Sequence, residues 1–193
     1  PGFTVGRREP MMGLRGIPEG ELHFERCFVS RENLLVEPGE GFKKLMRAYN
    51  GQRLGAATVA LGLAQGAYER ALAYATMRHQ FGRPIADFQG IRWKLADMAI
   101  QLDAARLLIH RAAAHAGHGF PDPVEAAKAK TFAAEMAQQV TSQALQIHGA
   151  AGYGRSLPLE RMVRDARMFA IGGGTVEMMR NLIADYLLPS RAD

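Results

Sequence analysis

Residues 54–72, LGAATVALGLAQGAYERAL, carry the periodicity that decides the fold. Apolar side chains recur there at intervals of three and four residues, which is the spacing of one face of an α-helix. The positions on this face are Leu54, Ala57, Leu61, Ala64, Tyr68 and Leu72. The stretch therefore predicts a long amphipathic helix that buries one side.

The same spacing continues toward the C-terminus. A second face comprises Ile91, Leu95, Met98, Leu102, Ala105 and Ile109, and a third includes Phe132, Met136, Val140 and Ile147. The third helix opens at Asp122-Pro123-Val124-Glu125, where Asp122 can cap, Pro123 suits the first helical position and Glu125 can return a bond to the cap. A shorter helix is expected from about Pro158 and a last one from about Thr175 to Leu187. Long helices joined by short Gly- or Pro-containing turns predict an antiparallel helical bundle.

The first forty residues have a different pattern. Residues 21–25, ELHFE, alternate polar and apolar side chains, which predicts a half-buried β-strand after the turn at residues 18–20. The helical period begins after the Pro-Gly pair at residues 38–39. We therefore expect a mainly α chain, with a β segment over residues 1–38 and a helical bundle over residues 39–193.

Length and composition allow a real core. With 193 residues, 48% of them hydrophobic, the chain suits one domain or a domain with a fragment of another. Because it begins at Pro1 inside a strand-and-turn region, we expect the C-terminal part of a longer protein. The longest apolar run, residues 54–64, is much shorter than the about 20 residues of a membrane span. A soluble, cytoplasmic protein without a membrane segment is the expectation, and the single Cys27 excludes an intrachain disulfide.

Four short blocks stand at the predicted helix ends and turns. They are YATMRHQFGRPI (74–85), QIHGAAGYG (146–154), VRDAR (163–167) and IGGGTVEMMR (171–180). With VGRR and GLRGIP in residues 1–35, they resemble blocks of the acyl-CoA dehydrogenase family, in the same order along the chain. One block alone is weak, whereas four in order are a strong signal. The resemblance implies that residues 1–38 end the family's middle β-domain and that residues 39–193 form its C-terminal helical bundle.

The resemblance also implies a flavoprotein that shares each FAD between subunits of a homodimer or homotetramer. The positions that match cofactor-binding residues of the family are Arg78, Gln80, Phe81, Gln146, Gly149, Thr175 and Glu177. A guanidinium can pair with two pyrophosphate oxygens, and an aromatic ring can pack on the flavin or adenine.

Several of these positions also have a purely structural explanation. Arg78 suits a helix C-terminus, Thr175 can be an N-cap, and Glu177 is favoured in a first helical turn. Residues 146–154, taken alone, lack the lysine of a P-loop and the preceding strand of a Rossmann fingerprint.

The third residue of the last block is Gly173, where most members of the family have the glutamate that removes the α-proton of a CoA thioester. A subset places this glutamate in the first long helix, directly before an arginine that helps bind CoA. Here that pair is Gln52-Arg53. An amide cannot accept a proton at neutral pH, so Gln52 can orient a substrate but cannot be a general base. Both catalytic positions, Gln52 and Gly173, thus lack the base, while Tyr49, Asn50 and Arg53 are expected on the acyl-CoA side.

The pair of Gln52 and Gly173 is similar to the desulfinase-like branch of the family. Those enzymes split sulfite from 3-sulfinopropionyl-CoA to leave propionyl-CoA, keep FAD bound and need no net redox change. A sulfinate β to the thioester is a leaving group, so abstraction of an α-proton is not the required event. Loss of the glutamate also removes a negative charge that would repel an anionic substrate. This reaction is our main expectation.

Two alternatives stay open. The first is ordinary α,β-dehydrogenation of an acyl-CoA with a base from outside this chain segment and, as a possible partner, an electron-transfer flavoprotein. The second is a non-catalytic binding or assembly protein. On the residues alone, Gln52 fits a solvated helix position, and Gly173 fits a turn that needs glycine for backbone geometry.

The charge pattern is less informative. A net charge of +5 suits polyanions such as CoA or FAD, and equally a weakly basic surface. The arginines are scattered, which gives nucleic-acid binding little support. His110, His115 and His118 lack a convincing further ligand set, so we expect a solvated helix end there and no metal site.

Overall fold

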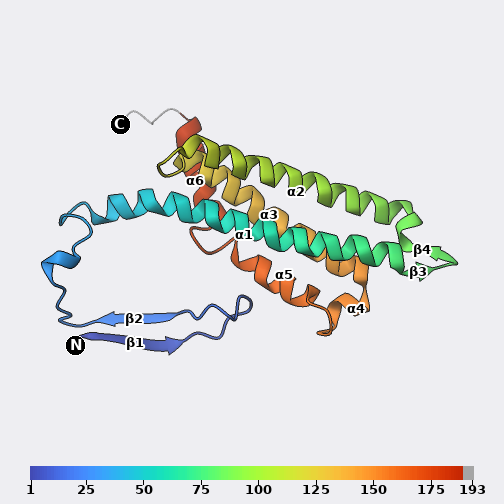
Figure 1. Cartoon of the computed structure of the whole chain (residues 1–193), viewed down its shortest axis with the longest axis horizontal. Helices are drawn as coiled ribbons and strands as arrows, with labels where there is room; N and C mark the ends of the chain where they lie inside the picture. The colour runs from blue at the N-terminus through green and yellow to red at the C-terminus, as the bar shows by residue number, and fades with distance from the viewer. Residues whose placement is uncertain (189–193) are drawn as a thin grey trace.

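The structure is a computed structural model that describes residues 1–188, and it is mainly α-helical (Figure 1). The helical bundle predicted from the periodicity is confirmed. In chain order the elements are β1 (Phe3–Arg8), β2 (Gly20–Phe24), η1 (Arg31–Asn33), α1 (Gly41–Met77), β3 (His79–Gln80), β4 (Arg83–Pro84), η2 (Ile85–Asp87), α2 (Gln89–Ala116), α3 (Pro123–His148), α4 (Ala150–Tyr153), α5 (Leu159–Met168) and α6 (Val176–Leu187). Within residues 1–188, no helix combines the length and the apolarity needed to cross a bilayer.

Helix α3 lies at the centre of the bundle. It packs against α1 and α2, and its remaining sides contact α5 and α6. Its start follows the predicted cap, because the Asp122 carboxylate accepts hydrogen bonds from the backbone N–H groups of Val124 and Glu125. Glu125 does not return a bond to the cap; its side chain pairs instead with Arg111 and His115 of α2. His115, one of the histidines considered above, thus lies beside a carboxylate of α3.

The buried face of α1 differs from the predicted one in its second half. Leu54, Ala57, Leu61 and Ala64 are buried as expected, but Leu72 is 42% exposed. Three alanines, Ala67, Ala71 and Ala75, line the contact instead. Small side chains let the backbones of α1 and α3 approach closely, so the larger leucine is turned outward. Phe132 of α3, also predicted to be buried, is likewise exposed.

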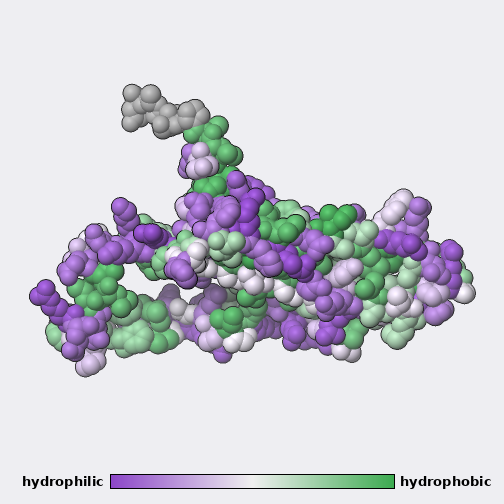
Figure 2. Space-filling view, turned by 45° about the horizontal axis from the view of Figure 1, so that its top comes forward, coloured by the Kyte–Doolittle hydropathy of each residue, from purple (hydrophilic) through white to green (hydrophobic). Residues whose placement is uncertain are grey.

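The β segment is an antiparallel pair of strands, β1 and β2, in which Phe3 lies opposite Phe24 and Val5 opposite Leu22. The strand predicted at residues 21–25 is therefore confirmed, but its half-buried character is wrong. Every residue of β2 is exposed, because only two strands pair and no helix packs on them. Figure 2 shows the resulting apolar surface over this segment, at the lower left.

Helix α5 anchors the loop between the two strands. The Asp165 carboxylate accepts a hydrogen bond from the backbone N–H of Leu14 at 2.7 Å. The Arg164 guanidinium donates to the carbonyl of Met12 at 2.7 Å and is held by both carboxylate oxygens of Glu160. A Cβ on Gly13 would lie 2.5 Å from the carbonyl oxygen of Arg164, so only glycine fits there. The VRDAR block thus joins the β segment to the bundle.

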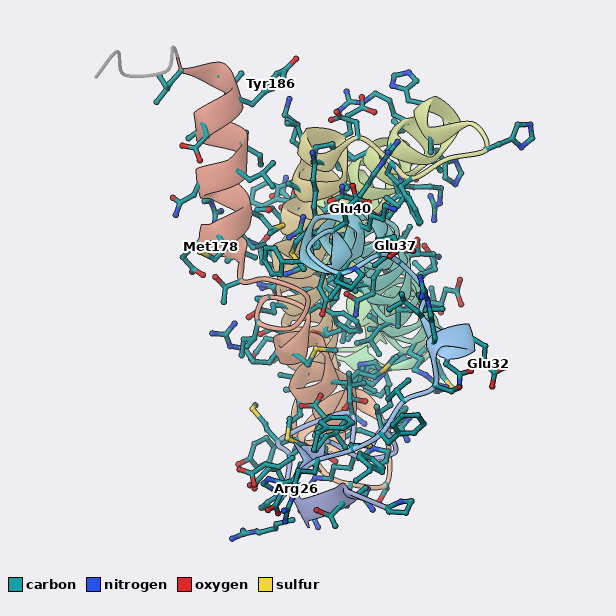
Figure 3. The ribbon with its side chains drawn as sticks, turned by 90° about the vertical axis from the view of Figure 1, so that its left-hand side faces the viewer. Arg26, Glu32, Glu37, Glu40, Met178 and Tyr186 are labelled. Atoms are coloured by element: carbon teal, nitrogen blue, oxygen red, sulfur yellow. The ribbon has the colours of Figure 1, made fainter. Side chains whose placement is uncertain are left out.

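Helix α6 packs against α3 at one side of the bundle, where Arg180 pairs with Glu135 of α3. Figure 3 shows Met178 and Tyr186 along it, and both side chains are exposed. Figure 3 also shows Glu37 and Glu40 at the beginning of α1, on the side that faces the viewer. The turn that leads into α6 lies against the first half of α1, because Arg53 donates a hydrogen bond to the carbonyl of Gly173.

Candidate functional site

Helix α1 brings Gln52 next to the turn between α5 and α6. A Cβ on Gly173 would lie 3.7 Å from the side-chain oxygen Oε1 of Gln52. The two positions predicted for the base therefore face each other, although they are far apart in the sequence. Neither position carries a carboxylate, so neither residue can serve as a general base.

The side chain of Arg53 links α1 to the same turn. Its Nε donates to the carbonyl of Gly173 at 3.4 Å, and its Nη1 donates to Oδ1 of the buried Asn50 at 2.9 Å. The guanidinium carbon lies 6.0 Å from the centre of the Tyr49 ring, within reach of a cation–π contact. The four residues predicted at 49–53 are thus close together, and Arg53 is fixed in place by its neighbours.

The turn itself needs its glycines. Gly173 and Gly174 have φ angles of +73° and +98°, in the left-handed region that residues with a side chain rarely adopt. Helix α6 begins directly after them: the Thr175 hydroxyl oxygen accepts a hydrogen bond from the N–H of Met178 at 3.3 Å, which confirms the predicted cap. Hydrogen bonds from its own backbone N–H and from Thr175 lower the pKa of the Glu177 carboxyl, which stays ionised.

Sequence reasoning missed one residue of this region, Lys130 of α3. Its ammonium donates a hydrogen bond to the carbonyl of Gly174. Burial lowers the pKa of Lys130, the Arg53 guanidinium lowers it further, and Glu177 opposes both effects. The sequence did contain a signal. Lys130 occupies an apolar position of the three- and four-residue repeat whose other members are Ala126, Ala133, Ala137, Val140, Ala144 and Ile147, all buried.

The other predicted residues lie at the far end of α1. Arg78 follows the last residue of the helix, and the hairpin of β3 and β4 carries Gln80 and Phe81 at its tip. Phe81 has a φ of +52° and is 92% exposed, so the hairpin presents its ring outward. A left-handed phenylalanine without burial is costly for the isolated chain, which is typical of residues held for binding.

The end of α3 lies at this same end of the bundle. The His148 ring stacks on Tyr74 of α1 with centroids 4.3 Å apart, which fixes the two helix ends together. The exposed Gln146 stands on the last turn of α3, and Gly149 ends the helix with a φ of +58°. No atom would lie within 4 Å of a Cβ on Gly149, so its backbone is open to an approaching group.

The predicted residues therefore form two groups. We call the first, Tyr49, Asn50, Gln52, Arg53, Gly173, Thr175 and Glu177, the glycine-turn site, and the second, Arg78, Gln80, Phe81, Gln146 and Gly149, the hairpin end. At 1.5 Å per helical residue, Gln52 and Arg78 are separated by about 39 Å along α1. One chain does not bring the two groups together.

The chain is similar in sequence and structure to proteins of one known family. Residues 39–188 match the description "Acyl-CoA dehydrogenase, C-terminal domain". Over 189 residues, 96% of this chain and 48% of the relative, the chain is 58% identical to the 3-sulfinopropanoyl-CoA desulfinase of Cupriavidus necator. The corresponding enzyme of Paraburkholderia xenovorans is also 58% identical, over 97% of this chain and 49% of the relative.

A solved structure agrees. The butyryl-CoA dehydrogenase of Megasphaera elsdenii superposes with a TM-score of 0.95 at 42% identity, covering 98% of this chain and 49% of that one. The chain therefore spans about half the length of the relatives that it matches. From the ordered sequence blocks, the helical bundle and these matches, the chain belongs to the acyl-CoA dehydrogenase family.

Proposed function

We propose that the full-length protein is a FAD-containing enzyme that releases sulfite from 3-sulfinopropionyl-CoA. The observation that carries the proposal is the pair of Gln52 and Gly173, which face each other and provide no carboxylate. The relatives at 58% identity bear the name of this activity. An uncharged amide opposite a glycine also accommodates an anionic acyl chain without the repulsion that a glutamate would exert.

The proposed reaction balances without an electron acceptor. The bond between C3 and sulfur breaks, its electron pair stays on C3, and C3 takes up a proton to give propionyl-CoA. The sulfur leaves as sulfur dioxide, which adds water to become hydrogen sulfite. Carbon gains the electrons that sulfur loses, so the sum of substrate and water equals the sum of the two products.

Within this reaction, the residues of the glycine-turn site bind and orient the thioester. Gln52 can donate an amide hydrogen bond to a substrate oxygen without removing an α-proton. Arg53 is held by Asn50 and by the carbonyl of Gly173, and its remaining donors suit an anionic group on the CoA side. A fixed guanidinium loses less entropy on binding than a free one.

The hairpin end fits a ligand that combines phosphates with aromatic rings. Arg78 is a cation, Gln80 and Gln146 are amides, Phe81 is an outward ring and Gly149 has an open backbone. This donor set suits FAD, which would supply the redox-active flavin ring of the site when bound. The distance of about 39 Å along α1 supports sharing: the hairpin end of one subunit would serve the glycine-turn site of its partner, in a homodimer or homotetramer.

A second candidate is α,β-dehydrogenation of a simple acyl-CoA. It is favoured by the 42% identity to a butyryl-CoA dehydrogenase, and it requires a base from outside this segment and an acceptor such as an electron-transfer flavoprotein. In either case we propose a cytoplasmic enzyme in which residues 1–38 belong to a β-domain.

The two candidates are separated by assaying flavin-loaded full-length protein in parallel. One assay measures sulfite release from 3-sulfinopropionyl-CoA, and the other measures dye reduction with butyryl-CoA. Sulfite without dye reduction supports the desulfinase, and dye reduction without sulfite supports the dehydrogenase. Failure to bind either FAD or a CoA thioester would instead indicate a non-catalytic assembly protein.

A further inference from the structure

Lys130 is the one ionic side chain of residues 1–188 that is fully enclosed, with 1% exposed. Burial of an ammonium group is strongly unfavourable unless a partner compensates for the lost water. The part of α3 around Lys130 is buried, since Ala126, Ala127, Ala129, Ala133 and Ala134 are all buried. The proposed reaction assigns Lys130 no task, although the charge is expensive to keep at this place.

The partner of Lys130 is the backbone of Gly173 and Gly174, which we call the glycine turn. The ammonium donates to the carbonyl of Gly174, and Arg53 donates to the preceding carbonyl, that of Gly173. Two cations from two different helices, α1 and α3, thus hold two successive carbonyls. Like charges so close repel each other, and the carbonyl oxygens together with Glu177 of α6 offset this repulsion.

The glycine turn is closed by the hydrogen bond from the N–H of Val176 to the carbonyl of Ala170, but its two glycines have few contacts of their own. Neither Gly173 nor Gly174 has a side chain to pack, and both adopt left-handed backbone conformations that glycine populates freely. The turn nevertheless has to present Gly173 to Gln52 and to begin α6 at Thr175. Its position therefore depends on the groups that bind its carbonyls.

We propose that Lys130 is a positioning residue, which together with Arg53 clamps the glycine turn opposite Gln52. This inference rests on the proposed function, because it concerns the geometry of that same site. Lys130 touches neither substrate nor cofactor in this account. It acts through the carbonyl of Gly174, and its loss would let the turn drift from Gln52.

The variant that tests the clamp is Lys130→Met, which keeps the length of the stem and removes the donor. In flavin-loaded full-length protein we expect kcat for sulfite release to fall about 10–100-fold with KM changed less than about threefold, because a displacement near 1 Å can cost that much rate. Lys128→Met is the control, since Lys128 lies on the same helix and is only partly buried; its kcat should stay within about twofold. Lys130→Gln keeps an N–H donor without the charge and should recover part of the rate.

Amide hydrogen exchange gives a readout that does not depend on turnover. In Lys130→Met, the amides of residues 173–176 should exchange about tenfold faster than in the wild type, while those of α2 stay unchanged. If Lys130→Met does not fold, Lys130→Leu, which also removes the donor, carries both measurements. Wild-type kcat together with wild-type exchange at residues 173–176 in Lys130→Met, or in Lys130→Leu where it takes its place, would overturn the clamp. A wild type that releases no sulfite would overturn the proposed function alone, since the exchange comparison would still test the clamp.

Discussion

The glycine-turn site and the hairpin end are built in opposite ways. At the glycine-turn site the polar groups find partners within the chain: Arg53 with Asn50 and Gly173, and Thr175 with the start of α6, while Lys130 holds the neighbouring Gly174. At the hairpin end, by contrast, Phe81 is held outward in a left-handed conformation. The first site is preorganised by its own chain, whereas the second is shaped to be completed by another surface.

The sharpest way to change the glycine-turn site is Gln52→Glu, which returns a carboxylate to one of the two base positions. A general base typically contributes about 10²–10⁴ in rate, so dye reduction with butyryl-CoA should rise by that order. Sulfite release should fall, because the new charge repels the sulfinate. The control is Gln139→Glu, the same exchange at an exposed position of α3. An increase in dye reduction in both variants would contradict a specific role of position 52.

The hairpin end is tested by Arg78→Ala. Loss of a hydrogen bond to a charged group typically costs about 1.5–3 kcal/mol, so flavin affinity should weaken by about 10–100-fold. Fluorescence titration of the apoprotein with FAD measures this. Arg70→Ala, at an exposed position of α1, should leave the affinity unchanged. Equal affinities for the Arg78 variant and the wild type would place the cofactor elsewhere.

A third experiment asks whether the glycine turn is as rigid as its contacts indicate. Gly174→Ala forces a side chain into a φ of +98° and brings its Cβ to 2.8 Å from the Met179 methyl group. We expect a loss of stability of about 1–3 kcal/mol, visible as a lower melting temperature. Gly154→Ala is the matched control, because Gly154 has a φ of −70° and its nearest neighbour would lie 3.7 Å away. Similar melting temperatures for the two variants would speak against a strained turn.

The joint between the β segment and α5 can be weakened without touching either site. Asp165→Ala leaves the N–H of Leu14 without its acceptor and should destabilise the protein by about 1–3 kcal/mol. Proteolysis of the loop at residues 11–15 should accelerate. Arg161→Ala removes only a long, exposed ion pair with the same carboxylate, at 3.9 Å, and should change stability by less than about 0.5 kcal/mol. Equal protease sensitivity of the two variants would contradict the joint.

The smallest effect concerns the pH dependence of stability. The folded pKa of Lys130 lies below its ordinary value of 10.5, so between these two values the unfolded chain binds more protons than the folded one. The free energy of unfolding therefore gains from rising pH in this window. The neighbouring Glu177 of α6, whose own pKa is lowered, stays ionised there. Relative to Lys130→Met, the wild type should become more stable as pH rises toward 10.5; a constant difference in melting temperature would contradict this.

The bundle and the glycine-turn site were predictable from the sequence for different reasons. Helix periodicity and the Asp122-Pro123 cap are local signals, and they located α1, α2 and α3, whose predicted faces are largely buried. Leu72 and Phe132 were predicted to be buried but are exposed. Periodicity alone cannot tell which of two neighbouring faces of a helix packs against the next helix. The facing of Gln52 and Gly173 came from family resemblance, since no local pattern joins positions so distant in sequence.

Lys130 escaped prediction for a physical reason. A lysine between alanines on a helix usually lies at the edge of the buried face with its ammonium in water. Its burial depends on the carbonyl of Gly174, which tertiary packing brings from another part of the chain. The pairing of Arg164 and Asp165 with the loop at residues 12–14 is non-local in the same way.

The measurement that tests the central claim most directly is the stoichiometry of turnover without any electron acceptor. Flavin-loaded full-length protein is incubated anaerobically with excess 3-sulfinopropionyl-CoA, and sulfite and propionyl-CoA are both quantified. If the facing pair of Gln52 and Gly173 marks a redox-neutral desulfinase, the two products form in equal amounts over many turnovers per flavin. Absence of sulfite, or its formation only after an acceptor is added, would contradict the account.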